Sequence, residues 1–325
     1  MPCFETGSGA LFDGDCVEVL QAMPDGSFDA VITDPPYAIS YDGNDWDRYG
    51  PTAYQQFCTQ WGGEALRVLK PGGHLLSFGA TRTYHRLTSG LEDAGFDIRD
   101  SIHWLYGSGM PKGKNLTGQW AGWGTCLKPA HEPIVVARRP FDGSLTDNVA
   151  TNGTGAINID ATRVPHEDAA KPDRWPPNVV LSPTDDGDCP VEELEAQHTG
   201  ASRFYPTFNY CAKPSTVERN VGLDHLPRVA KVQPVTGRTS APMANTHPTV
   251  KPLALMRWLV RLVNPPGGMV LDPFAGSGTT LVATMLEGGY AVGIEMTNDY
   301  LPFIEGRMAW ASGDSELVTA DPTAS

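Results

Sequence analysis

The segment Val270-Leu-Asp-Pro-Phe-Ala-Gly-Ser-Gly-Thr-Thr280 decides the fold of this chain. Its apolar start predicts a buried strand over 269–271, and Gly276 and Gly278 predict a tight turn before a helix over 279–286. Glycine lets the backbone approach a ligand closely. A helix N-terminus offers unpaired N–H groups and the positive end of its dipole to an anion. The segment therefore predicts a strand, turn and helix of an α/β sheet, with room for a ligand at the turn.

An acidic residue follows the next predicted strand. This strand is expected over 290–294, and Glu295 stands at its end, where a carboxylate can accept hydrogen bonds from both ribose hydroxyls. A nicotinamide cofactor favours a third glycine, but position 281 is leucine. Together these elements indicate a site for a nucleoside cofactor. A strand-to-helix turn that binds no ligand also uses glycine, so this alternative stays open.

Strand-like and helix-like patterns alternate on both sides of a long irregular stretch. Beyond the elements above, strands are expected over 28–33, 74–78, 96–106 and 133–137, and helices over 52–69, 83–94, 253–263 and 298–310. This alternation predicts an α/β fold with a doubly wound, mostly parallel sheet. We expect four parts: a first half of the sheet domain (1–139), a loop-rich insert (140–246), a second half (247–311) and a polar tail (312–325).

The composition limits the class of protein. Hydrophobic residues make up 40% and charged residues 19% of the 325 residues, which is typical of a globular protein. The six cysteines are scattered and form no CxxC pair, so we expect reduced thiols and no metal site. No apolar run approaches about 18 residues, and the N-terminus lacks a basic stretch followed by an apolar one. We therefore expect a cytoplasmic protein that does not enter a membrane.

The charge is distributed unevenly. The net charge of −14 disfavours nucleic-acid binding by the chain as a whole, because phosphate contacts need Lys and Arg. Segment 201–252, however, carries seven basic and two acidic residues with aromatic residues between them. This pattern predicts a nucleic-acid face, with Arg203, Lys213 and Arg219 as candidate contacts. A solvated loop explains the same pattern, and the glycine-rich loop that holds Trp120 and Trp123 is equally ambiguous.

The tetrapeptide Asp34-Pro-Pro-Tyr37 stands where the strand over 28–33 ends. An aromatic amine is a poor nucleophile, because its lone pair is delocalised into the ring. The Asp34 carboxylate and the Pro35 carbonyl can accept its two hydrogens and direct the lone pair toward an electrophile. Tyr37 can stack on a base that has left the duplex. Two prolines that only end a strand, followed by an incidental tyrosine, are the alternative.

The motifs together closely resemble those of the DNA amino-methyltransferases, which act on adenine N6 or cytosine N4. The resemblance rests on Asp34-Pro-Pro-Tyr37, on Asp272-Pro-Phe-Ala-Gly-Ser-Gly-Thr-Thr280 and on His247-Pro-Thr-Val-Lys-Pro252. Gly14-Asp15 resembles the family's element near the cofactor adenine. The catalytic element comes first and the cofactor element last. This order resembles the circularly permuted "beta" class, in which the insert recognises the target.

The resemblance implies roles for individual residues, with S-adenosyl-L-methionine as the cofactor and double-stranded DNA as the substrate. It implies that the target amino group and base are held by Asp34, Pro35, Pro36 and Tyr37. It implies that the cofactor is bound by Asp15, Thr249, Lys251, Asp272, Phe274, Gly276, Gly278, Thr279 and Glu295. Among these, Glu295 would bind the ribose. Asp272 would orient the cofactor ammonium or the glycine turn, although a strand-end cap is the alternative.

The resemblance also favours one target base. Aspartate as the first residue of the tetrapeptide is typical of adenine enzymes, whereas serine is typical of cytosine-N4 enzymes, so we expect adenine N6 with cytosine N4 as the alternative. Cytosine C5 chemistry needs a thiolate, and the lone Pro-Cys pair, Pro2-Cys3, lies in the N-terminal tail. An inactive DNA-binding protein and an enzyme acting on RNA or a protein amide are remote alternatives. A restriction endonuclease partner and a homodimer stay open.

Overall fold

The computed structural model describes residues 1–40, 47–107, 109, 113–183, 189–208, 216–230, 239 and 241–313. The described strands are β1 (Phe4–Thr6), β2 (Gly9–Asp13), β3 (Phe28–Thr33), β4 (Leu69–Phe78), β5 (Asp97–Leu105), β6 (His131–Arg138), β7 (Val179–Leu181), β8 (Met269–Asp272) and β9 (Tyr290–Glu295). The described helices are α1 (Cys16–Gln21), α2 (Pro51–Val68), α3 (Tyr84–Asp93), α4 (Leu145–Asn152), α5 (Pro190–Gln197), α6 (Thr216–Asn220), α7 (Leu253–Val263), α8 (Thr279–Leu286) and α9 (Leu301–Ser312).

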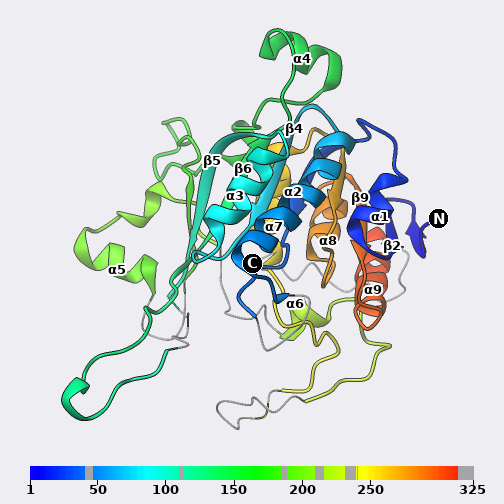
Figure 1. Ribbon diagram of the computed structural model, residues 1–325. Coiled ribbons are helices and arrows are strands. Elements are labelled where there is room, and N and C mark those ends of the chain that lie inside the picture. The colour runs from blue at the N-terminus through cyan, green and yellow to red at the C-terminus, as the bar shows by residue number, and fades with distance from the viewer. Residues whose placement is uncertain are drawn as a thin grey trace.

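The strands form one twisted sheet in the order β1-β2-β9-β8-β3-β4-β6-β5-β7 (Figure 1). From β2 to β4 every neighbouring pair is parallel. β6 is antiparallel to both β4 and β5, so its amino end lies at the edge where the other two strands end. The predicted α/β fold with a mostly parallel sheet is confirmed.

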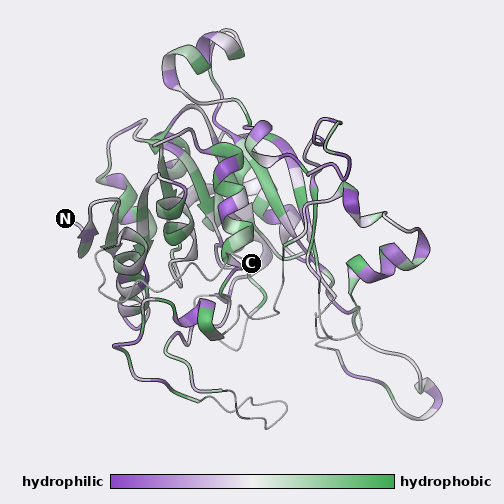
Figure 2. Ribbon diagram, turned by 180° about the vertical axis from the view of Figure 1, so that it is seen from behind, coloured by the Kyte–Doolittle hydropathy of each residue, from purple (hydrophilic) through white to green (hydrophobic). Residues whose placement is uncertain are grey.

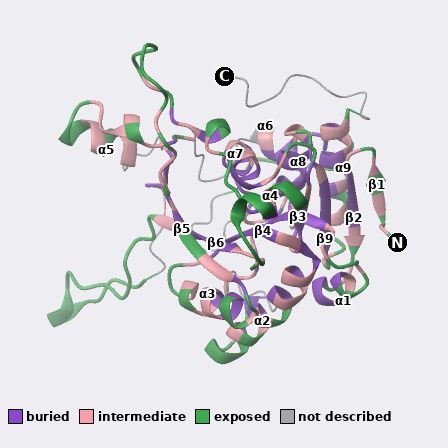
Figure 3. Cartoon of the chain, turned by 90° about the horizontal axis from the view of Figure 1, so that it is seen from above, coloured by how far each residue is buried: buried purple, intermediate pink, exposed green. Residues whose placement is uncertain are grey.

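Helices cover both faces of the sheet. Along β3, Val31 faces a core built with α1, α2 and α3, whereas Ala30 and Ile32 face a core built with α7 and α8. Successive side chains of a strand point to opposite faces of the sheet, and a layer of helices covers each face here. All six residues of β3 are therefore buried. Figure 3 shows α2 and α3 on one side of the sheet and α7 and α8 on the other, and Figure 2 shows the apolar residues concentrated between these layers.

The two central strands lead in opposite directions. The chain leaves β3 through α2 toward β4, and leaves β8 through α8 toward β9 on the other side. Ligands of doubly wound sheets bind at the carboxyl edge where the order reverses in this way. Thr33 at the end of β3 donates a hydrogen bond of 2.7 Å to Asp272 at the end of β8, which joins positions 239 residues apart. The switch point therefore brings the tetrapeptide beside the glycine turn.

Most elements match the sequence predictions to within a few residues, and α7 and α8 match them at both ends. β4 differs, because it begins at Leu69 rather than at position 74. The register of the β3–β4 pair shifts between Phe28 and Ala30, and this shift lets Leu69 pair with Phe28 ahead of position 74. β1, β2 and α1 were not predicted, and β7, in the predicted insert, pairs with β5 as the last strand of the sheet. Among the described helices, none combines the length and apolarity that crossing a membrane requires.

Candidate active site

The tetrapeptide is tied to two helices on one side of the sheet. The hydroxyl of Tyr54 on α2 donates to the Pro36 carbonyl at 2.9 Å. Thr83, which precedes α3, donates its hydroxyl to the Tyr37 carbonyl at 2.6 Å. Pro35 between them is buried. These bonds fix the backbone that carries Asp34 to the same layer that packs against β3.

A buried carboxylate holds the backbone beyond the tetrapeptide. Asp47 accepts N–H hydrogen bonds from Tyr37 at 2.7 Å, from Ala38 at 2.6 Å and from Ile39 at 3.1 Å. Ala38 has a φ of 56° and Ser40 a φ of 53°, in the left-handed region that non-glycine residues rarely adopt. The three bonds to Asp47 hold the chain in this strained turn. Residues 41–46, which precede Asp47, lie outside the described residues.

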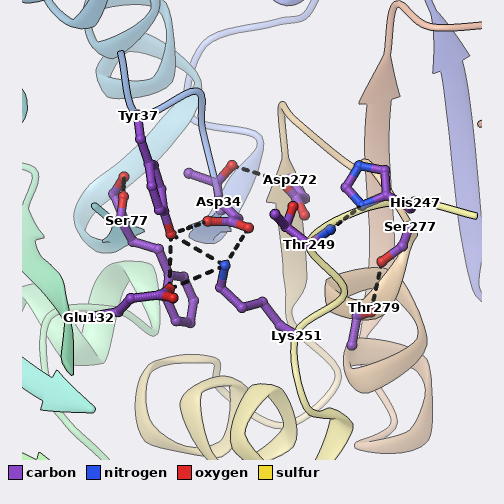
Figure 4. Close-up of polar contacts among 12 residues, drawn as sticks. Asp34, Tyr37, Ser77, Glu132, His247, Thr249, Lys251, Asp272, Ser277 and Thr279 are labelled. Atoms are coloured by element: carbon purple, nitrogen blue, oxygen red, sulfur yellow. Dashed lines mark hydrogen bonds and ion pairs between the residues drawn. The ribbon is translucent and has the colours of Figure 1, made fainter. Parts of the chain in front are cut away.

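Four polar side chains from three distant segments meet at the end of β3 (Figure 4). Lys251 Nζ lies 2.5 Å from Asp34 Oδ2, 3.2 Å from the Tyr37 hydroxyl and 3.4 Å from Glu132 Oε2. The Tyr37 hydroxyl lies 2.6 Å from Asp34 Oδ1 and 3.1 Å from Glu132 Oε2. We call Asp34, Tyr37, Glu132 and Lys251 the charged cluster. It contains two carboxylates and one ammonium group.

Burial and charge set the protonation of this cluster. Burial by itself lowers the pKa of Lys251, but Asp34 and Glu132 outweigh it and raise that pKa above its usual value. Burial and the same two carboxylates raise the pKa of Tyr37 well above its usual value. Burial raises the pKa of Asp34, and the Lys251 ammonium opposes this rise. At neutral pH Lys251 is therefore charged and Tyr37 neutral.

The Lys251 ammonium is engaged by the charged cluster, and its expected contact with the cofactor stays a prediction. Lys251 also lies over the rings of Tyr37 and Phe78, at 5.5 and 4.8 Å from their centroids. Thr249 lies two residues earlier, and its backbone N–H donates to His247 Nδ1 at 3.4 Å. The segment 247–252 thus bridges the tetrapeptide and the glycine turn.

The glycine turn needs its glycines for two reasons. Gly276 and Gly278 have φ values of 53° and 73°, which favour glycine. A Cβ at position 276 would also lie 3.0 Å from His247 Nε2, and one at 278 would lie 3.0 Å from a side-chain carbon of Ile304. The turn is therefore shaped by close protein neighbours as well as by its backbone conformation.

Two acidic residues organise this turn. Glu295 is buried and accepts backbone hydrogen bonds from Gly276 and Thr297, both at 2.8 Å. Asp272 accepts from the Phe274 N–H at 3.1 Å as well as from Thr33. Burial raises the pKa of Asp272 to about 6. Asp272 therefore bonds to the backbone at the start of the turn, while its expected role toward the cofactor stays a prediction.

The remaining predicted cofactor residues have structural contacts of their own. The Phe274 ring packs edge-on against Trp61 with centroids 5.5 Å apart, and Thr279 begins α8 with its hydroxyl 3.0 Å from Ser277 Oγ. Asp15 caps α1 by accepting from the N–H groups of Val17 and Glu18. It lies beside the end of β9, because the Gly14 N–H donates to the Glu295 carbonyl.

The three candidate DNA contacts have different outcomes. The prediction that Arg219 contacts a phosphate is wrong, because this residue is buried and its guanidinium donates to the carbonyls of Asn245 and His247. It therefore braces the start of segment 247–252. Arg203 is partly exposed and lies 3.5 Å from Glu167. Lys213 lies outside the described residues.

Three residues of the site were missed from the sequence: Asp47, Glu132 and Arg307. Arg307 on α9 is fully buried and donates to the Ser277 carbonyl at 2.6 Å and to Thr279 Oγ1 at 3.0 Å. Burial lowers the pKa of Arg307 to about 10. Glu132 could have been noticed as an acidic residue at the start of a strongly apolar strand. Arg307 carries no local signal, because its partners Ser277 and Thr279 lie 28 to 30 positions away, and nothing in the sequence distinguishes Asp47 from the other acidic residues beside it.

Comparisons with known proteins agree with the site. A family profile described as DNA methylase matches residues 28–306. The type II methyltransferase M.HindIII of Haemophilus influenzae is 23% identical over 89% of this chain and 91% of its own length. M.ScaI of Streptomyces caespitosus, also a type II methyltransferase, is 24% identical over 94% of this chain and 83% of its own length. The structure of PvuII DNA methyltransferase (cytosine-N4-specific) matches with a TM-score of 0.61 at 16% identity, over 94% of this chain and 88% of that one.

Proposed function

The chain belongs to the N6/N4 DNA methylase family, and we propose that it methylates the N6 amino nitrogen of adenine in DNA. Its cofactor is S-adenosyl-L-methionine. The observation that carries the proposal is the Asp34 carboxylate, held at the carboxyl end of β3 within the charged cluster and beside the glycine turn. A carboxylate in this place can accept a hydrogen bond from an amino group that lies opposite the cofactor.

The residues at the carboxyl edge fit the cofactor by their chemistry. S-adenosylmethionine carries two cationic groups and two ribose hydroxyls, and the edge presents the carboxyl groups of Asp15, Asp272 and Glu295. Glu295 would accept from the ribose while it keeps its two backbone bonds, because a carboxylate has about four acceptor sites. When bound, the cofactor supplies an electrophilic methyl group. The positive φ values of Gly276 and Gly278 shape the backbone of the turn that would face the cofactor.

We assign the chemistry on the DNA to the tetrapeptide. Asp34 and the Pro35 carbonyl accept the two amino hydrogens and turn the nitrogen lone pair out of the ring plane. The backbone bonds to Asp47, Tyr54 and Thr83 hold this geometry before the base arrives. Tyr37 offers its ring to the extruded base. The proton that the amino group loses passes first to Asp34, whose pKa is raised by burial.

Lys251 and Glu132 support these roles through other residues. The Lys251 ammonium keeps Asp34 charged in a desolvated place, and Glu132 holds Lys251 and the Tyr37 hydroxyl from the opposite side. A desolvated carboxylate without such a partner would take up a proton, and it would then be a weaker acceptor for the amino hydrogen of the base. We therefore infer that Lys251 sets the lower pH limit of activity.

The choice of adenine rests on Asp34 as the first residue of the tetrapeptide. The alternative is cytosine N4, since both bases present an amino group beside a ring nitrogen. Methylated DNA is digested to nucleosides and separated by mass spectrometry. N6-methyl-2′-deoxyadenosine as the main product supports the proposal, whereas a predominance of N4-methyl-2′-deoxycytidine refutes the adenine assignment and leaves the amino-transfer mechanism intact.

We further propose that segment 140–246 recognises the target sequence and that the chain acts beside a restriction endonuclease of the same specificity. Its type II methyltransferase relatives support the second point. Single-molecule sequencing of DNA from cells that express the chain reports the modified base and its sequence context together. A single short context is expected, and methylation without sequence preference contradicts both points.

A further inference from the structure

A long arm leaves the sheet between β5 and β6. Figures 1 and 3 both show the segment 113–130 standing away from the body of the molecule. Where the arm leaves the sheet, the chain segments at its two ends are joined by a hydrogen bond of 2.9 Å from the Tyr106 N–H to the Ala130 carbonyl. Gly122 near the tip lies eight positions before Ala130, so an extended arm reaches about 25 Å at about 3.3 Å per residue.

The tip of the arm exposes two tryptophans. Trp120 is 51% and Trp123 63% exposed, and their rings meet edge to face with centroids 5.7 Å apart. The backbone around them is ordered by its own bonds: the Leu116 N–H donates to the Trp123 carbonyl at 2.8 Å, and the Trp123 N–H donates to the Trp120 carbonyl at 3.0 Å. The rings are therefore presented to solvent by a folded turn, which is costly unless they meet a partner.

The charge of the arm identifies the kind of partner. The chain has 38 acidic residues, yet none lies between Asp100 and Glu132. The arm itself carries Lys114 and Lys128. A stretch of sequence that contains lysines and no acidic residue suits a polyanion, and exposed tryptophans suit the faces of nucleic-acid bases.

The arm also starts at the right place. β4 is parallel to β3, and β6 is antiparallel to both β4 and β5, so β5 runs in the same direction as β3. β5 therefore ends, at Leu105, on the edge of the sheet where Asp34 lies. Glu132, two residues after the arm, belongs to the charged cluster. DNA bound to the arm would therefore lie at the same edge of the sheet as the reacting base.

We propose that residues 113–130 form a DNA-binding arm, whose Trp120 and Trp123 insert between bases next to the extruded nucleotide and whose Lys114 and Lys128 contact phosphates. The proposal rests on DNA being the substrate. Apolar side chains that enter a base step unstack it, which lowers the free energy needed to extrude the neighbouring base. The arm thus gives an acidic protein a local grip on DNA.

The test compares variants of the full chain in titrations of a fluorescein-labelled duplex of mixed sequence, followed by anisotropy. The double change Trp120→Ala and Trp123→Ala is expected to raise the Kd about 10- to 100-fold. The double change to phenylalanine, which keeps a stacking surface, is expected to raise it less. Lys114→Ala and Lys128→Ala should together flatten the log–log salt dependence by about two units. Cofactor affinity, measured by calorimetry, should stay unchanged and reports correct folding.

The matched control for the lysines is Arg99→Ala. Arg99 is an exposed basic residue near the start of β5, at the end of that strand opposite to the arm, and its removal should leave DNA affinity and its salt dependence unchanged. An unchanged Kd in the tryptophan-to-alanine variant refutes the proposed DNA-binding role of the arm. If that variant keeps full DNA affinity but no longer self-associates in sedimentation experiments, the arm binds a second copy of the chain and the proposal is also refuted. If the wild type binds DNA through the arm but forms no methylated nucleoside, the proposed function fails and the arm stands.

Discussion

The two halves of the site are built in different ways. The glycine turn depends mainly on backbone groups and on residues from Asp272 to Arg307, with Thr33 and His247 as its distant contacts. The charged cluster depends on side chains from β3, from the start of β6 and from the segment before α7, up to 217 residues apart. The difference teaches that binding a common cofactor needs a local backbone shape, whereas activating the substrate needs charges that only the folded chain brings together.

The largest expected effect comes from removing the group closest to the chemistry. Asp34→Ala should lower the rate of methyl transfer by about 1000-fold or more, because the amino group loses its charged acceptor. Cofactor affinity should not change if the two halves are separate. Single-turnover transfer of a labelled methyl group and calorimetry measure the two quantities. Activity within about tenfold of the wild type would remove Asp34 from its assigned role.

Removing the ammonium of the cluster tests how its charges are coupled. Lys251→Met should lower the rate about 100-fold, because Asp34 and Glu132, whose side chains are only 19% and 22% exposed, then lack a cation. Without Lys251 the pKa of Asp34 rises further, so the acid limb of the pH–rate profile should move to higher pH.

The control for this variant adds Glu132→Gln, which removes the second carboxylate and should restore part of the rate. Cofactor affinity should be kept in both variants. A large loss of cofactor affinity in Lys251→Met would instead return Lys251 to the cofactor site that the family resemblance implies.

The cofactor half should respond in affinity rather than in rate. Glu295→Ala should weaken S-adenosylmethionine binding by about 1.5–3 kcal/mol, the range for a hydrogen bond to a charged group. The rate at saturating cofactor should change little. Glu295→Gln keeps one acceptor for the Gly276 N–H and should fall between the two. Equal affinity of all three proteins in calorimetry would place the ribose elsewhere.

The smallest expected effect concerns stability. The pKa of Asp272, about 6 in the folded protein, lies above its unfolded value of 3.8, so the folded state binds this proton more tightly. The contribution of Asp272 to stability is therefore fully present below about pH 4 and is lost as the pH rises through about 6. Asp272→Asn, which can still accept from Phe274, should be more stable than the wild type at pH 7.5 by about 1–3 kcal/mol.

Denaturant unfolding of both proteins across this pH range measures the effect. The gain should shrink as the pH falls toward about 3, where Asp272 is largely protonated in both the folded and the unfolded state, and the other titrating groups contribute equally to both proteins. A difference that does not depend on pH would show that Asp272 does not carry this titration.

Sequence reasoning predicted the elements well where periodicity is strong. The buried strand that ends at Thr33 and the helix Leu253–Val263 follow from runs of apolar residues, and both agree with the structure. It failed where the pattern is short, as for β1, β2 and α1. Arg219 shows the limit for single charges: a basic residue in a basic segment was expected at the surface, but it is buried where it satisfies carbonyl groups.

The sequence by itself determined the sheet type, the family and the positions of the tetrapeptide and the glycine turn, because these depend on local backbone geometry and on residue types at fixed spacing. Only the tertiary structure decided which side chains join Asp34. Antiparallel pairing of β6 with β4 brings Glu132 to the carboxyl edge, and the segment before α7 places Lys251 there. Electrostatic partners are chosen by proximity in space, and nothing in the spacing along the chain records it.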